Sequence, residues 1–139
     1  MTNSLLENTA EALSYFSGFN DAVGVESVNV TSLADFMKRE SVKEIDLLKL
    51  DLQGGELSAL IGLHEQILNV KAIFLEVQFL QLYKSGCLFR EIDEYLQDQG
   101  FAFFQFYSLV RSPHNGRLLY GDALFLNTNY FELNSCAKK

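Results

Sequence analysis

Two carboxylates, Asp51 and Glu76, are the residues best placed to do chemistry, because each belongs to a short apolar run typical of a buried strand. Asp51 directly follows Ile45–Leu50 and precedes a pair of glycines, and Glu76 lies inside Ala72–Leu80. In open α/β sheets, ligands bind at the carboxyl ends of the strands. A carboxylate there can orient a substrate or take a proton from its hydroxyl group.

Each of these carboxylates also has an alternative reading. Asp51 could instead cap the helix that is expected after the two glycines. An unpaired charge is costly inside a strand, so Glu76 must face a partner, a polar cavity or the end of the sheet. Lys49 is its candidate ion partner, although a lysine at the surface is an equal alternative.

The remaining polar candidates have structural alternatives as well. Glu56 is predicted in the first turn of the helix, where it either stabilises the helix dipole or binds substrate. His114 lies in a turn between Arg111 and Arg117, so these side chains either contact an anionic substrate or are solvated turn residues. His64 is expected on the buried stripe of its helix, as a core or boundary histidine.

The elements that must position these residues follow from the apolar pattern. A strand, a helix and a second strand over residues 45–80 predict a parallel pair with a right-handed crossover. The apolar face of this helix is formed by Leu57, Leu60, Ile61, Ile67 and Leu68. A further helix ends at Gly100, and two strands, Phe101–Val110 and Arg117–Asn127, are expected to be antiparallel because a short turn joins them.

Upstream of this unit the pattern is weaker. Ser4–Phe16 is weakly helical, and a loop is expected over Ser14–Val25. The alternation of apolar and polar residues predicts a half-buried strand over Val28–Thr31. Ser32 and Asp35 have the spacing of a helix N-terminus. The buried face of that helix is expected to carry Leu33, Phe36 and Met37.

The residues around Asp51 resemble the signature of the FkbM-type methyltransferase family. Lys49–Leu57 reads KLDLQGGEL and is followed by Leu60 and Gly62. The family commonly shows K-[IL]-D-[VL]-[EQ]-G-x-E-L, then a leucine and a glycine. The resemblance continues, in order along the chain, at Asn3–Glu7, Val28–Phe36, Phe74–Val77, Leu80–Tyr83 with Leu88–Phe89, and Gly121–Phe125.

This resemblance implies a partial Rossmann-like class I methyltransferase fold, with parallel strands, crossover helices and a C-terminal antiparallel strand pair. Val28–Thr31, Ile45–Leu50 and Ala72–Leu80 would be its third, fourth and fifth strands. We expect one α/β domain over residues 1–133, followed by a polar tail at 134–139.

The resemblance also implies an activity, the O-methylation of a sugar or secondary-metabolite hydroxyl with S-adenosylmethionine as cofactor. The residues it assigns are Asp51 and Glu76 as catalytic groups, Ser32, Leu33, Asp51 and Leu52 as cofactor contacts, and Glu56 and His114 as substrate contacts. The family's glycine-rich cofactor turn has no counterpart, since Asp21–Gly24 lacks both a second glycine and a preceding apolar strand. We therefore interpret the chain as the C-terminal portion of a methyltransferase; the alternative is a non-catalytic α/β interaction module or relic.

Composition sets the remaining expectations. A length of 139 residues suits one domain, and a net charge of −7 argues against a nucleic-acid partner. Neither cysteine has metal-site spacing, and no apolar run is long enough to span a membrane, so a cytoplasmic location is expected. Without a first strand beside it, Ile45–Leu50 would have an unpaired edge, which predicts self-association or pairing with a separately encoded N-terminal half.

Overall fold

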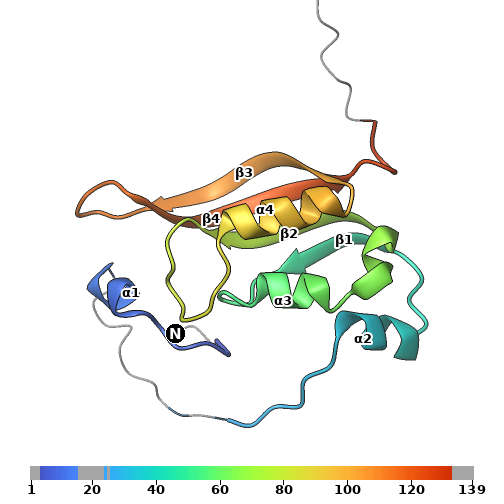
Figure 1. Cartoon of the computed structure of the whole chain (residues 1–139), viewed down its shortest axis with the longest axis horizontal. Coiled ribbons are helices and arrows are strands. Elements are labelled where there is room, and N and C mark those ends of the chain that lie inside the picture. Colours follow the sequence, from blue (N-terminus) through green and yellow to red (C-terminus); the bar gives the residue numbers. More distant parts are fainter. Residues whose placement is uncertain (1–3, 16–23, 25, 133–139) are drawn as a thin grey trace, which may run out of the picture.

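The computed structural model describes residues 4–15, 24 and 26–132 of the chain (Figure 1). One four-stranded sheet has the strand order β1-β2-β4-β3. Along the chain the elements are α1 (Ala10–Tyr15), α2 (Leu33–Arg39), β1 (Ile45–Leu50), α3 (Glu56–Ile61), the 3-10 helix η1 (His64–Asn69), β2 (Val70–Gln78), α4 (Phe89–Asp98), β3 (Phe101–Arg111) and β4 (Leu118–Asn127).

The pairing of the strands confirms the α/β class and both predicted strand pairs. β1 and β2 are parallel, with a register that runs from Ile45 opposite Val70 to Leu50 opposite Leu75. β4 is antiparallel to both β2 and β3. Only one of the three strand pairs is therefore parallel, so the described sheet is mixed rather than dominated by parallel pairs.

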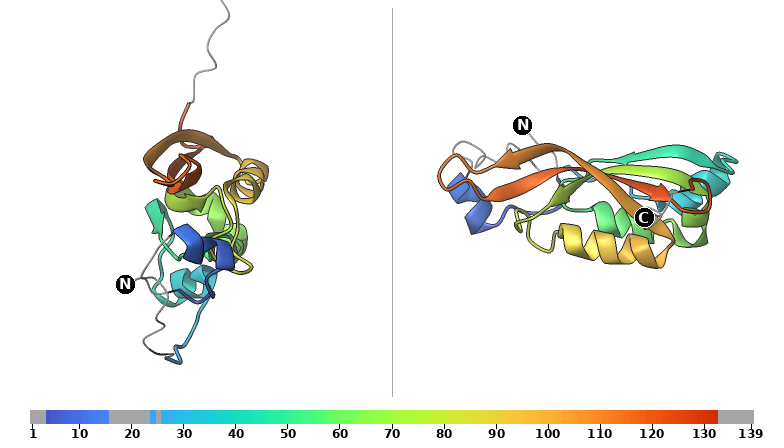
Figure 2. Two further views of the ribbon diagram at one scale, coloured as in Figure 1. Left: turned by 90° about the vertical axis from the view of Figure 1, so that its left-hand side faces the viewer. Right: turned by 90° about the horizontal axis from the view of Figure 1, so that it is seen from above.

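The hydrophobic core lies between the sheet and the helices α3 and α4, which cover the same face of the sheet (Figure 2). Alternate residues of the central strand β2 point into this core, because side chains alternate between the two faces of a strand. Ile73, Leu75 and Val77 of β2 and Phe125 of β4 are fully buried there. The opposite face of the sheet carries Lys49, Phe74, Glu76, Asp122 and Leu124.

Two expectations for the region before β1 are wrong. Val28–Thr31 forms no strand, and Val28 and Val30 are 61% and 76% exposed. A half-buried strand needs a neighbouring strand, and no described strand lies beside this segment. The predicted start of α2 is confirmed, because Ser32 Oγ accepts a hydrogen bond from the Asp35 amide at 3.0 Å. Met37 is buried as expected, whereas Phe36 is exposed.

The helix after β1 is shorter than the apolar pattern predicts. α3 ends at Ile61, and the chain continues as η1 after His64, whose φ is +49°. This break changes the phase of the side chains, so Ile61 and Leu68 are exposed while Leu63 is fully buried. His64 is exposed as well, contrary to the expectation that it lies on a buried stripe.

The N-terminal region is only partly helical. α1 occupies Ala10–Tyr15, and the described residues before it are not helical. Most of the predicted loop over Ser14–Val25, and the polar tail, lie outside the described residues. None of the helices in the described ranges is both long and apolar enough to cross a bilayer.

Candidate active site

The carboxylate of Glu56 stabilises the turn between β1 and α3. Gln53 and Gly54 have positive φ angles of 54° and 101°, which reverse the chain directly after the strand. The Glu56 carboxylate accepts hydrogen bonds from the amides of Leu52, at 2.7 Å, and Gly54, at 3.0 Å. Burial raises the pKa of Glu56, while these hydrogen bonds lower it. This geometry favours the stabilising role of Glu56 over a contact with substrate.

The side chains of Asp51 and Glu76 lie near each other beside this turn, at the carboxyl ends of the two parallel strands. The Gln53 amide connects them, because Nε2 donates to Asp51 Oδ1 at 2.8 Å and to Glu76 Oε1 at 3.5 Å. On its other side, Gln53 Oε1 accepts a hydrogen bond from the hydroxyl of Tyr83. Four side chains from three segments of the chain therefore form one hydrogen-bonded group.

Asp51 does not cap α3, so the structural alternative for this residue is not observed. The N-cap position is Gly55, which has no side chain to accept a hydrogen bond. The Asp51 carboxylate is instead half exposed, and Lys49 Nζ lies 3.4 Å from its Oδ2. The ion pair of Lys49 is therefore with Asp51; of its two alternatives, the pair with Glu76 does not form, and Lys49 is a lysine exposed at the surface.

Glu76 lies in a negative environment. It is opposite Asp122 in the register between β2 and β4, and its side chain is only partly exposed. Burial, followed by the charges of Asp51, Glu56 and Asp122, raises the pKa of Glu76 to about 7, and the hydrogen bond from Gln53 opposes this shift. Near neutral pH, the carboxyl group is therefore divided between its protonated and ionised forms.

Two members of this group, Gln53 and Tyr83, and the neighbouring Asp122 were not assigned from the sequence. Gln53 occupies the glutamate-or-glutamine position of the family pattern, and Tyr83 lies in another matching stretch, so a signal existed for both. Asp122 also lies in a matching stretch, but its place beside Glu76 depends on the register of β2 against β4. A register is fixed by the packing of the whole sheet.

The four residues assigned to the cofactor do not form one site. Asp51 and Leu52 precede the start of α3, whereas Ser32 and Leu33 lie at its other end, where the Ala34 amide donates to the carbonyl of Gly62. Both hydrogen bonds of the Ser32 hydroxyl are with Asp35, inside the cap of α2. The described residues therefore do not form a continuous cradle for S-adenosylmethionine.

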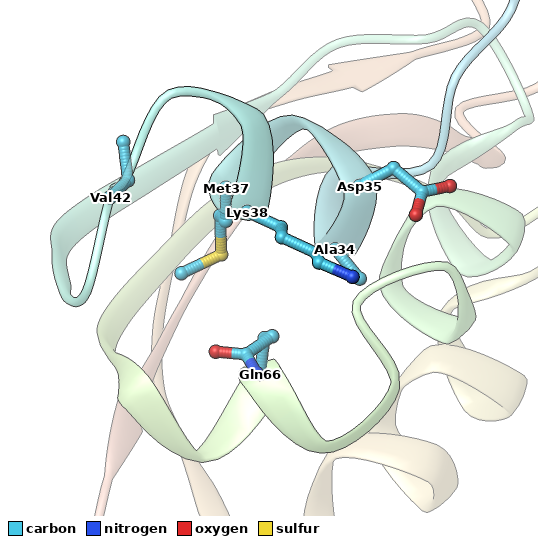
Figure 3. Close-up of a pocket in the computed structure, with 6 residues that line it drawn as sticks. All are labelled: Ala34, Asp35, Met37, Lys38, Val42 and Gln66. Carbon is cyan, nitrogen blue, oxygen red and sulfur yellow. The ribbon is translucent and has the colours of Figure 1, made fainter.

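Two hollows on the surface of the described residues lie away from the carboxylates of Asp51 and Glu76. One, of about 300 Å³, is bounded by α2, the loop after it and η1, and Figure 3 shows Met37 and Gln66 facing each other across it. Another, of about 490 Å³, lies beside η1 and the end of α4. Asp51 and Glu76 are among the lining residues of neither of these two hollows.

His114 is exposed in the turn between β3 and β4. The two arginines near it are used within the chain, since Arg117 pairs with Glu11 at 3.1 Å and Arg111 donates to the carbonyl of Gly116. These contacts favour the structural alternative for the turn. Within the described ranges, no group of three histidine, cysteine, aspartate or glutamate side chains is arranged to hold a metal ion.

Comparison with known proteins gives one match. A family model described as the methyltransferase FkbM domain matches residues 2–103. The matched segment includes Asp51, Gln53, Glu76 and Tyr83, while Asp122 lies outside it. No curated protein and no solved structure matches the chain.

Proposed function

This chain belongs to the FkbM methyltransferase family, and on that premise we propose that it acts in the transfer of a methyl group to a hydroxyl oxygen, with Glu76 as the base. The main support for this proposal is that the side chains of Glu76 and Asp51 lie close together at the carboxyl ends of β1 and β2. This is the edge of an α/β sheet where ligands bind.

A hydroxyl oxygen must lose its proton as it attacks a methyl group. A general base is most effective when its pKa lies near the operating pH, and the pKa of Glu76 is raised to about 7. The half-exposed carboxylate of Asp51 would accept a hydrogen bond from the substrate and orient it. The substrate we propose is a small molecule with a hydroxyl group, such as a sugar or a secondary metabolite.

S-adenosylmethionine would supply the methyl group when bound. Because the assigned cofactor residues lie at the two ends of α3, we propose that these four residues do not hold the cofactor by themselves. This fits our interpretation of the chain as the portion of a methyltransferase that provides the base and the substrate surface. In such displacements, much of the rate enhancement comes from the alignment of the reacting groups.

Replacement of the base tests the proposal. In the active protein that contains this sequence, we expect Glu76→Gln to reduce kcat for methyl transfer by about a hundredfold or more, because glutamine cannot accept the proton. Glu65→Gln is the matched control, since Glu65 is an exposed glutamate on η1. Transfer of a labelled methyl group is the measurement, with circular dichroism to confirm folding. A Glu76→Gln variant as active as the control would contradict the role of Glu76.

A further inference from the structure

The amide of Gln53 has one orientation that satisfies all of its neighbours. Its Nε2 faces the carboxylates of Asp51 and Glu76, which can only accept hydrogen bonds when they are ionised. Its Oε1 accepts from Tyr83. If the amide were rotated by half a turn, Oε1 would face two negatively charged groups. The ionised carboxylates therefore select this orientation, and the Tyr83 hydroxyl pairs with the amide oxygen on the other side.

Tyr83 is held firmly in its own position. Its side chain is buried in a small apolar group with Leu80, Leu82 and Leu119. The N-terminal segment passes beside it, with the amide of Thr9 bonded to the carbonyl of Leu82 and the amide of Lys84 bonded to the carbonyl of Glu7. The hydroxyl that anchors Gln53 therefore belongs to a packed part of the structure.

We propose that Gln53 is the positioning residue of this site: its amide, anchored by a hydrogen bond from the hydroxyl of Tyr83, keeps the carboxylates of Asp51 and Glu76 directed toward the same bound hydroxyl group. This proposal rests on the proposed function, because it assigns Gln53 a role in that reaction. Gln53 acts through the two carboxylates and not on the reacting atoms.

The charges around Glu76 give this role a measurable consequence. The groups that raise its pKa are Asp51 after β1, Glu56 on α3 and Asp122 on β4, while the hydrogen bond from Gln53 lowers it. The ammonium group of Lys49 is engaged with Asp51, and the pKa of Tyr120 on β4 is itself raised, by burial first and then by Glu76 and Asp122. The loss of the Gln53 amide should therefore raise the pKa of Glu76 further.

Two substitutions test the role of Gln53 without the need for turnover. Gln53→Asn retains an amide at a residue with positive φ, a conformation that asparagine tolerates, but shortens the side chain by one methylene group. Tyr83→Phe retains the ring and removes the hydroxyl. We expect each to raise the midpoint of the Glu76 carboxyl titration, measured by ¹³C NMR on the 139-residue chain, by about half a pH unit.

Matched controls separate this effect from general disturbance. Gln66→Asn and Tyr95→Phe make the same chemical changes at residues whose hydrogen bonds are with Asn69 and the carbonyl of Leu60. Both should leave the Glu76 midpoint unchanged. An unchanged midpoint in Gln53→Asn would overturn the proposal, as would a Tyr83→Phe shift no larger than that of its control.

Turnover then distinguishes this proposal from the proposed function. In the active protein, Gln53→Asn should shift the acidic limb of the pH profile of kcat/KM upward, together with the Glu76 midpoint. If Glu76→Gln abolishes methyl transfer and Gln53→Asn shifts neither quantity, the function stands and the role of Gln53 is refuted. If Glu76→Gln remains active, the proposed function fails and the role of Gln53 in that reaction fails with it, whatever the titration shows.

Discussion

The carboxyl group of Glu76 is surrounded by groups that disfavour its ionisation. Asp51, Glu56 and Asp122 all raise its pKa, in addition to the effect of its burial. A charge kept in such a position destabilises the folded chain, so its presence at the carboxyl end of a strand is better explained by chemistry than by stability.

The free energy of unfolding should depend on pH, because ionised Glu76 destabilises the folded chain. Glu76 ionises near pH 4.5 when unfolded but at about pH 7 when folded, so between these values the folded state binds more protons and stability falls as the pH rises. Glu76→Gln should match the wild type near pH 4 and be more stable above pH 7, by on the order of 1 kcal/mol after allowance for solvent screening. Urea denaturation at the two pH values measures this. A constant difference between the two proteins across this range would contradict it.

At the residue scale, the sequence predicts the two carboxylates better than the groups that connect them. Asp51 and Glu76 are predictable together, because the carboxyl ends of adjacent parallel strands meet at one edge of a sheet. The bridge through Gln53 depends on a positive φ angle in the turn, and Tyr83 reaches it from a segment 30 residues away. Neither condition is visible in local periodicity.

At the scale of the elements, the turn after β1 is the point where three segments converge. Gly54 has a φ of +101°, and a Cβ atom built on it would lie 3.2 Å from Leu6 Cδ1 and 3.2 Å from Tyr83 Cβ. The carbonyl of Gly54 also accepts a hydrogen bond from the amide of Cys87 at 3.3 Å. The turn therefore requires glycine both for its backbone conformation and for its close packing.

Alanine substitution separates these two requirements. Gly54→Ala should lower the free energy of unfolding by about 2 to 3 kcal/mol, because it adds unusually close contacts with Leu6 and Tyr83 to the strain of a positive φ. Gly116→Ala is the matched control, since Gly116 has a φ of +72° but nothing within 4 Å of its added Cβ. That variant should lose about 1 kcal/mol. Equal losses in chemical denaturation would show that crowding by Leu6 and Tyr83 adds nothing.

The predicted elements differ in accuracy for a physical reason. β1, β2 and the start of α2 follow from local signals, namely short apolar runs and the Ser32–Asp35 cap, and the structure confirms them. Val28–Thr31 has the alternation of a strand, but none of the described strands lies beside it. The break between α3 and η1 leaves Ile61 and Leu68 exposed, contrary to their expected burial, which a continuous helical period could not predict.

At the scale of the whole molecule, β1 lies at an edge of the sheet. It pairs with β2 on one side, and no described strand pairs with it on the other (Figure 2). Charged side chains normally protect such an edge. Here Asp46 shares Lys71 with Glu44, at 2.8 and 2.6 Å, and Lys49 pairs with Asp51 at 3.4 Å, so each charge of β1 already has an oppositely charged partner within the chain.

We therefore expect the chain to self-associate through β1. Light scattering coupled to size exclusion should give an average mass that rises with protein concentration. Leu47, which is 58% exposed on β1, provides the test, because Leu47→Lys places an unpaired cation on the edge strand and should favour the monomer. Leu68→Lys is the control, since Leu68 is 51% exposed on η1 and not on β1.

The pattern of the results would locate the contact. If only Leu47→Lys reduces the mass, association depends on the β1 edge, because both variants remove a similarly exposed leucine and add the same charge. If both variants reduce it equally, net charge or general apolar surface drives association, and the edge is not specifically involved. A wild-type chain that stays monomeric at all concentrations would contradict the prediction.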